Sequence, residues 1–279
     1  MATTTITLIT TPERIPTMFE YEFMQNAFAA SGIVAVLAGV VGYFLVLRGQ
    51  TFAGHALSHV GFTGATGAVL VGMSPLWGMI GFTLAAGIGM GALGEKLTGR
   101  DVAIGVILTL SLGFGLLFLH FFTAYASQAT ALLFGNVLGV DVKAVRTLAV
   151  LAAASLLALA FISRPLLFAS LQAELAEARG LPMRALSIGF LVIVAVAVAE
   201  SAQIVGVLLV FALMVGPGAV ARTLARGVAT GVACAAALAL TEAWGGLTLS
   251  FYTDWPASFW IAALSGVAYF GALAVSGRA

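Results

Sequence analysis

The chain contains 279 residues, of which 61% are hydrophobic and only 8% are charged, and its mean hydropathy is +1.11. Because a soluble globular domain carries about 25% charged residues, this composition excludes one. The net charge of +1 provides no basic surface for nucleic acid. A single cysteine, Cys234, excludes an intramolecular disulfide and argues against a thiolate metal cluster.

The first 26 residues contain no basic segment followed by an apolar core, so they do not have the pattern of a secretory signal. We expect residues 1–26 to form a tail and an interfacial segment, in which the stretch FEYEFMQNAF lies along the membrane surface. Residues 27–279 are then expected to form a single transmembrane domain.

Long stretches after residue 26 contain no Asp, Glu, Lys or Arg. They are residues 27–47, 53–73, 75–94, 102–140, 147–163, 185–199, 201–221, 227–241 and 255–277. A spanning helix needs about 20 apolar residues. The pattern therefore predicts an all-α polytopic membrane protein with eight or nine transmembrane helices. The longest stretch can hold one span and a buried or re-entrant piece.

Arginine and lysine indicate the orientation, because basic residues of short loops favour the cytoplasmic side. If nine spans alternate from an N-terminus outside, three basic residues face outward and nine face inward. The outer three are Arg14, Lys143 and Arg146. This bias predicts a cytoplasmic C-terminus. An eight-span arrangement with the opposite N-terminus remains open if one short stretch is re-entrant.

Two places suggest interrupted helices. Residues 185–221 resemble a hairpin that turns at residues 200–203, and Pro217 lies between two glycines, where it would bend or stop a helix. Broken helices often line the pathway of a transporter. An ordinary kink in a packed helix explains Pro217 equally well.

The most polar inner loop predicts a short amphipathic helix at about residues 171–182. Its apolar face comprises Leu171, Leu175 and Ala178. Its polar positions are Gln172, Glu174, Glu177 and Arg179. Gly180 is a natural stop, and Pro182 prevents continuation. Such a helix is either a structured loop or a docking element for a cytoplasmic partner.

Five stretches, in this order, carry a resemblance to a known family. They are GYFLVLRGQTFAGHALSHVGFTGATGAVL (42–70), LLFGNVLGVD (132–141), ELAEARGLPMRAL (174–186), VGVLLVFALMVGPGAVARTLAR (205–226) and LSFYTDWPAS (249–258). Together they resemble the permease subunits of ABC importers for zinc, manganese or iron. The resemblance covers nearly the whole chain after Met18 and implies a multi-pass protein of a bacterial or archaeal cell membrane.

The resemblance also implies partners: a second permease copy in a homodimer, a dimer of cytoplasmic ATP-binding subunits, and an extracytoplasmic metal-binding protein. The short inner helix would be the coupling helix. Its contacts with the ATPase would be Gln172, Glu174, Leu175, Glu177, Ala178, Arg179 and Gly180. The sequence contains no G-x-x-x-x-G-K-[ST] phosphate-binding loop, so the chain is expected to be non-catalytic, with ATP hydrolysed by another subunit.

His55 and His59 are the strongest metal candidates. Residues four apart share one helix face with about 6 Å of rise between them. Polar side chains within a membrane usually mark function, although two imidazoles could also hydrogen-bond across the bundle. The family typically has Asp at the position of His55 and His at that of His59. Because imidazole suits zinc better than manganese, the substitution favours zinc as the transported ion, with manganese or iron as alternatives.

Three residues are weaker candidates. His120 could complete a site near the outer surface or simply lie at the interface, and Glu200 and Glu242 could attract a cation in the outer half. Two other functions compete. An intramembrane metalloprotease needs H-E-x-x-H, but Ala56 follows His55 and the general base is absent. A secondary transporter driven by an ion gradient would explain broken helices, but not the amphipathic inner helix.

Overall fold

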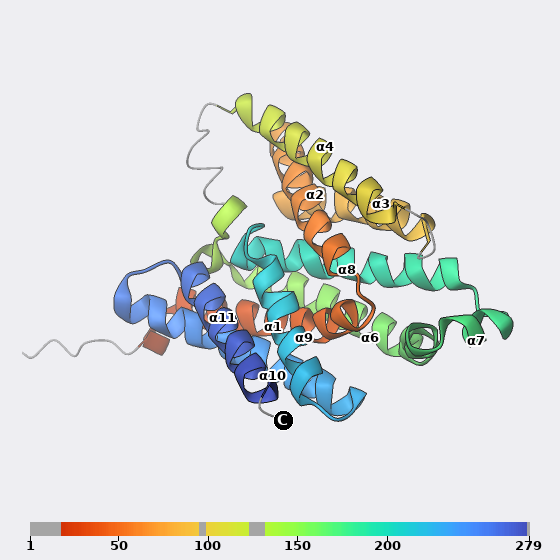
Figure 1. The fold of residues 1–279 in the computed structure, drawn as a ribbon. Helices are drawn as coiled ribbons and strands as arrows, with labels where there is room; N and C mark the ends of the chain where they lie inside the picture. The colour runs from red at the N-terminus through yellow and green to blue at the C-terminus, as the bar shows by residue number, and fades with distance from the viewer. Residues whose placement is uncertain (1–17, 95–98, 123–131, 278–279) are drawn as a thin grey trace, which may run out of the picture.

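The structure is a computed structural model that describes residues 18–94, 99–122 and 132–277. These residues form a helical bundle without any β-strand (Figure 1). In chain order the helices are η1 (Met18–Glu20), α1 (Glu22–Leu47), α2 (Thr51–Leu70), α3 (Pro75–Ala92), α4 (Arg100–His120), η2 (Val137–Gly139), α6 (Val142–Leu171), α7 (Ala173–Ala178), α8 (Met183–Val205), α9 (Val210–Leu224), α10 (Val228–Thr253) and α11 (Ala257–Ser276).

Seven of these helices are long and apolar enough to cross a membrane: α1, α3, α4, α6, α8, α10 and α11. The more polar α2 and the 15-residue α9 pack among them. Helices satisfy their own backbone hydrogen bonds, which hydrocarbon requires of any lipid-exposed segment. The prediction of an all-α polytopic membrane protein is confirmed.

The helices differ in how deeply they are buried. In α1 and α8, 72% of the most apolar window lies inside the bundle, against 17% in α4 and 22% in α6 and α11. Helices α2, α3 and α4 lie on one side of α8, and α10 and α11 lie on the other (Figure 1). We conclude that α1 and α8 form the centre, while outer helices turn apolar side chains such as Phe161, 88% exposed, toward lipid.

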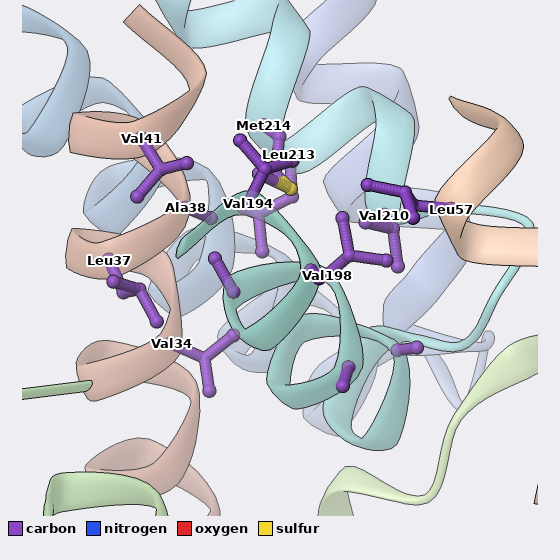
Figure 2. Close-up of a cluster of buried hydrophobic side chains, with 14 of the residues drawn as sticks. Val34, Leu37, Ala38, Val41, Leu57, Val194, Val198, Val210, Leu213 and Met214 are labelled. Atoms are coloured by element: carbon purple, nitrogen blue, oxygen red, sulfur yellow. The ribbon is translucent and has the colours of Figure 1, made fainter. Parts of the chain in front are cut away.

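The centre is a continuous apolar cluster to which α1, α2, α8 and α9 contribute (Figure 2). Its labelled members are Val34, Leu37, Ala38, Val41, Leu57, Val194, Val198, Val210, Leu213 and Met214. Helices α1 and α9 approach closely at Gly42, where a Cβ would lie 1.8 Å from the carbonyl oxygen of Met214. Small residues allow such approaches between membrane helices.

The turn expected at residues 200–203 is misplaced, and of the two interpretations of Pro217 a stop of the helix does not occur. Helix α8 continues through residues 200–203 to Val205, and the turn to α9 lies at residues 206–209, where Gly206 adopts φ +85°. Pro217 lies inside α9 and does not end it, because packed neighbours stabilise a membrane helix around a missing hydrogen bond. The first helix also begins at Glu22, within the stretch expected to be interfacial, while residues 1–17 lie outside the described part.

Candidate functional site

The two histidines lie on one face of α2, as their spacing predicts. Their ring centroids are 4.9 Å apart and the rings are nearly perpendicular. The ring of His55 also packs at 5.4 Å against Phe211, in the first turn of α9. The Nδ1 atoms of both histidines are buried and have no hydrogen-bond partner in the described part of the chain. These two nitrogens are therefore available as ligands.

The pair does not form part of a larger ligand cluster. Among the described residues, no group of three His, Cys, Asp or Glu side chains is placed to hold a metal ion. A structural zinc site has four protein ligands in a closed tetrahedron. Two ligands are suited to a transient contact, from which an ion can leave.

His120 does not join the pair. It is exposed at the C-terminal end of α4, with its ring 5.7 Å from that of Phe121. Helices α2 and α4 run in the same direction, since the Thr63 hydroxyl donates to the Ser111 carbonyl and Gly67 faces Phe118. The pair lies in the N-terminal half of α2, so His120 is near the opposite end.

Glu200 and Glu242 are both buried, which the sequence did not reveal. Glu200 in α8 is 0% exposed, and neither of its carboxylate oxygens has a hydrogen-bond partner among the described residues. Glu242 in α10 faces Ser265 of α11, without a hydrogen bond of normal geometry. Ser265 in turn donates to the Ala212 carbonyl at 3.1 Å. The first turn of α9 thus makes two contacts. Phe211 packs against His55, and the Ala212 carbonyl accepts from Ser265, the residue that Glu242 faces.

A helical turn at residues 132–134 meets the non-helical segment between the C-terminal end of α8 and the N-terminal end of α9. The amides of Val207 and Leu208 donate to the carbonyls of Leu132 and Leu133 at 3.2 and 3.3 Å. Residues 132–135 and 205–208 form this contact, which we call the clasp. Gly135 (φ +80°) and Gly206 (φ +85°) lie where a Cβ on either would come within 2.3 Å of a carbonyl oxygen of the other segment. Only glycine fits both positions.

A cavity of about 550 Å³ borders the clasp on the side that the charge bias places outside. Its lining includes Phe134, Asn136, Val205 and Trp255, and Asp254 is the only charged residue among the described lining. Neither His55 nor His59 lines this cavity. The cavity and the histidine pair are therefore separate spaces in this structure.

At the opposite end, α7 covers Ala173–Ala178 and is shorter than the expected helix. Leu171 belongs to α6 and is 66% exposed, because Gln172 breaks the helix (φ −141°, ψ 64°). The expected apolar face is therefore wrong. Ala176 is the buried residue of α7, while Leu175, 44% exposed, and Ala178 face outward.

The end of α7 follows the prediction. Gly180 adopts φ +76° and donates to the Glu177 carbonyl at 2.9 Å, and Leu181 donates to the Ala176 carbonyl at 3.1 Å. These two bonds form a Schellman motif. A small cluster of Ala169, Ala176 and Leu186 holds α7 against α6 and α8. The seven predicted coupling residues are all exposed: Gln172, Glu174, Leu175, Glu177, Ala178, Arg179 and Gly180.

Comparisons with known proteins agree with this arrangement. The model of the ABC 3 transport family matches residues 20–276. The probable iron transport system membrane protein of Haemophilus influenzae is 30% identical over 238 residues, which cover 84% of this chain and 87% of that protein. The manganese transport system membrane protein MntC of Listeria monocytogenes is 28% identical over 235 residues, 84% of each chain. The structure of PsaBC from Streptococcus pneumoniae in complex with Fab superposes with a TM-score of 0.82 at 25% identity and covers 92% of both chains.

Proposed function

The chain belongs to the ABC 3 transport family, and from this premise we propose that it is the permease through which an ATP-driven importer carries zinc. Its relatives are named for manganese and iron transport, and the fold is that of an ABC-type metal importer permease. One observation supports the path through this chain: two imidazoles lie together inside a membrane bundle with buried, unpartnered Nδ1 atoms. Burying polar groups in a membrane is costly, so their position favours a functional role.

The chemistry of the pair favours zinc over manganese. Imidazole nitrogen suits zinc, copper, nickel and iron, whereas manganese prefers carboxylate and carbonyl oxygen. His55 and His59 contribute nitrogen only, and within the described residues no acidic side chain completes a cluster with them. Manganese and iron remain the alternative ions, and His120, Glu200 and Glu242 remain weaker candidates for contacts along the path.

The proposed partners meet the two ends of the bundle. A dimer of ATP-binding subunits would bind the exposed residues of α7, which the Schellman motif and the small apolar cluster hold in a fixed position. An extracytoplasmic metal-binding protein would release the ion into the outer cavity. A second, identical permease copy would complete the importer, and residues 27–279 would act as one permease domain.

In the proposed transport step, the ion passes from the outer cavity to the histidine pair when the clasp separates. The clasp rests on two backbone hydrogen bonds and contains no charged side chain, so it can open without breaking an ion pair. The two neutral imidazoles then bind the ion and release it toward the cytoplasm. A two-ligand contact avoids trapping the ion, which a conducting path requires.

The test is uptake of radioactive zinc by proteoliposomes that contain the permease with its ATPase. The double variant His55→Ala/His59→Ala is expected to lower uptake at least about tenfold, since even loss of a supporting contact costs 10- to 100-fold in metal affinity. His120→Ala tests the weaker candidate separately and should lower uptake less than the double variant does, because this exposed histidine lies near the other end of α2.

Co-purification of the ATPase with each variant shows whether assembly is intact. Wild-type zinc uptake by an intact double variant would contradict the role of the pair. Uptake that continues without ATP would instead support a secondary transporter driven by an ion gradient.

A further inference from the structure

Arg48 joins three helices at the cytoplasmic end of the bundle. It follows α1 directly, in the turn that leads to α2. Its Nη1 donates to the Ser170 hydroxyl of α6 at 2.9 Å and, at a longer 3.5 Å, to the Leu166 carbonyl. Its guanidinium lies 5.4 Å from the ring centroid of the buried Phe190 of α8. The turn between α1 and α2 is thus bound to α6 and α8 through one side chain.

Both ends of the Arg48–Ser170 contact lie next to functional elements. Ser170 precedes α7 by three residues, and Arg48 precedes α2 by the same distance. His55 follows one helical turn later. The contact therefore joins two residues that are 122 positions apart in sequence. Ser170 lies just before the proposed coupling helix α7, and Arg48 lies just before α2, which carries the histidine pair.

A second arginine ties the same end of α1 to α9. Arg222, near the C-terminus of α9, donates from Nη1 to the Val46 carbonyl at 3.0 Å. Since α9 also places Phe211 against His55, this end of α1 is linked both to α2, which carries the pair, and to α9, which contacts it. A displacement of this end changes the position of α2 relative to its neighbours.

The charge of Arg48 persists at neutral pH. Burial, and then the like charge of Arg100, lower the pKa of Arg48 to about 10. The guanidinium is therefore protonated in the cell, and its bond to Ser170 is charge-assisted, which makes it about twice as strong as a neutral one. Lysine would keep the charge but not the planar group that both donates to α6 and stacks on Phe190.

We propose that Arg48 is a positioning residue that transmits the movement of α7 to α2 and thereby changes the metal affinity of the His55–His59 pair when ATP binds. This inference rests on the proposed function, because it takes α7 as the point where the ATPase acts and the pair as the metal contact. When ATP binding moves α7, Ser170 moves with the end of α6. The bond to Arg48 then displaces the turn that begins α2.

The test uses the permease–ATPase complex in lipid nanodiscs and measures its affinity for Co²⁺ from visible absorption. The affinity is measured with and without a non-hydrolysable ATP analogue, and the ratio of the two values reports the coupling. In the wild type, the nucleotide is expected to change the affinity by about 5- to 150-fold, the usual range of allosteric coupling. Ser170→Ala and Arg48→Met are each expected to bring this ratio close to one while leaving the nucleotide-free affinity unchanged. Arg48→Lys should restore only part of the ratio.

Ser163→Ala is the matched control. Ser163 lies about two turns before Ser170 in α6 and donates to the Ala160 carbonyl of its own helix, as Ser170 donates to Leu166. Both variants lose one hydroxyl and one bond within the helix, but Ser170→Ala alone loses the hydroxyl acceptor of Arg48. The double variant Arg48→Met/Ser170→Ala should be no worse than Arg48→Met alone, because that single variant already removes the Arg48–Ser170 bond.

The outcomes separate this inference from the function on which it rests. A wild-type ratio in Ser170→Ala, or additive effects in the double variant, would overturn the role of Arg48. If the complex with Arg48→Met fails to assemble, Ser170→Ala still tests the proposal, because this variant removes only one hydroxyl group and is expected to fold. If His55→Ala/His59→Ala binds Co²⁺ as the wild type does, the pair is not the metal contact and both proposals fall.

Discussion

In the proposed function, the side chain of His55 decides which ions the pair can hold. With an imidazole at this position, both donors of the pair are nitrogen. The ring of His55 lies between two neighbours, His59 at 4.9 Å and Phe211 at 5.4 Å. A change of donor at this residue should therefore alter the choice of metal more than the arrangement of the helices.

We predict that His55→Asp shifts transport from zinc toward manganese, because a carboxylate oxygen is a harder ligand than imidazole nitrogen. The measurement is the ratio of radioactive zinc to radioactive manganese taken up from an equimolar mixture. His120→Asp makes the same change at the weaker candidate, which is exposed and lies away from the pair, and should change the ratio less. An unchanged ratio in His55→Asp would show that this side chain does not contact the ion.

Among the elements, the clasp joins two segments that are far apart in the sequence. It places non-helical backbone between α8 and α9, where the amides of residues 207 and 208 are satisfied by residues 132 and 133. Non-helical backbone at membrane depth persists where protein or a water-filled space surrounds it. The adjacent cavity of about 550 Å³ is consistent with a segment that moves during transport.

Gly206→Ala should weaken the clasp. The residue has φ +85° and ψ 154°, a region that is essentially restricted to glycine, and a Cβ would meet the Leu133 carbonyl at 2.3 Å. Strain and overpacking together predict a loss of about 1–3 kcal/mol, visible as a lower Tm of the purified permease. Gly189→Ala in the preceding helix α8, where a Cβ meets nothing within 4 Å, should not lower the Tm. Equal Tm values for both variants would argue against a tight clasp.

At the scale of the whole molecule, the bundle has a buried centre and two different ends. Helices α1 and α8 form the centre, while only 17–22% of the apolar windows of α4, α6 and α11 is buried. One end carries α7, which lies at one corner of the bundle (Figure 1). An ATP-binding subunit that binds α7 would act on the ends of α6 and α8, because α7 is held between these two helices.

Ala178→Trp should therefore release the ATPase. Ala178 is exposed on α7, so a large side chain would disturb docking without entering the core. We expect loss of the ATPase from the co-purified complex, with the permease itself still extracted as a folded protein. Lys143→Trp, at an exposed position near the start of α6, is the control and should retain the ATPase. Retention by Ala178→Trp would exclude this face of α7 as the contact.

The sequence alone determined the features that depend on neighbouring residues. Charge-free stretches require helices in hydrocarbon, the spacing of His55 and His59 places them on one helix face, and Gly180 ends α7 in a left-handed conformation. Each follows from backbone hydrogen bonding or helical periodicity within a few residues. The helix break at Gln172 is also a local feature. The sequence did not reveal it, because the spacing of apolar residues is helical on both sides of Gln172 and hides the change in which face is buried.

Tertiary structure decided what depends on segments far apart in the chain. It placed the turn at Gly206 because residues 132–135 accept the amides of that segment, and it kept Pro217 inside α9. It also separated His120 from the pair and brought Arg48 to Ser170, 122 positions away. Apolar periodicity shows which face of a helix is buried, but not which other helix covers that face. The neighbouring helix is decided by how side chains from distant segments pack together, and the order of residues along the chain does not show which of them will meet.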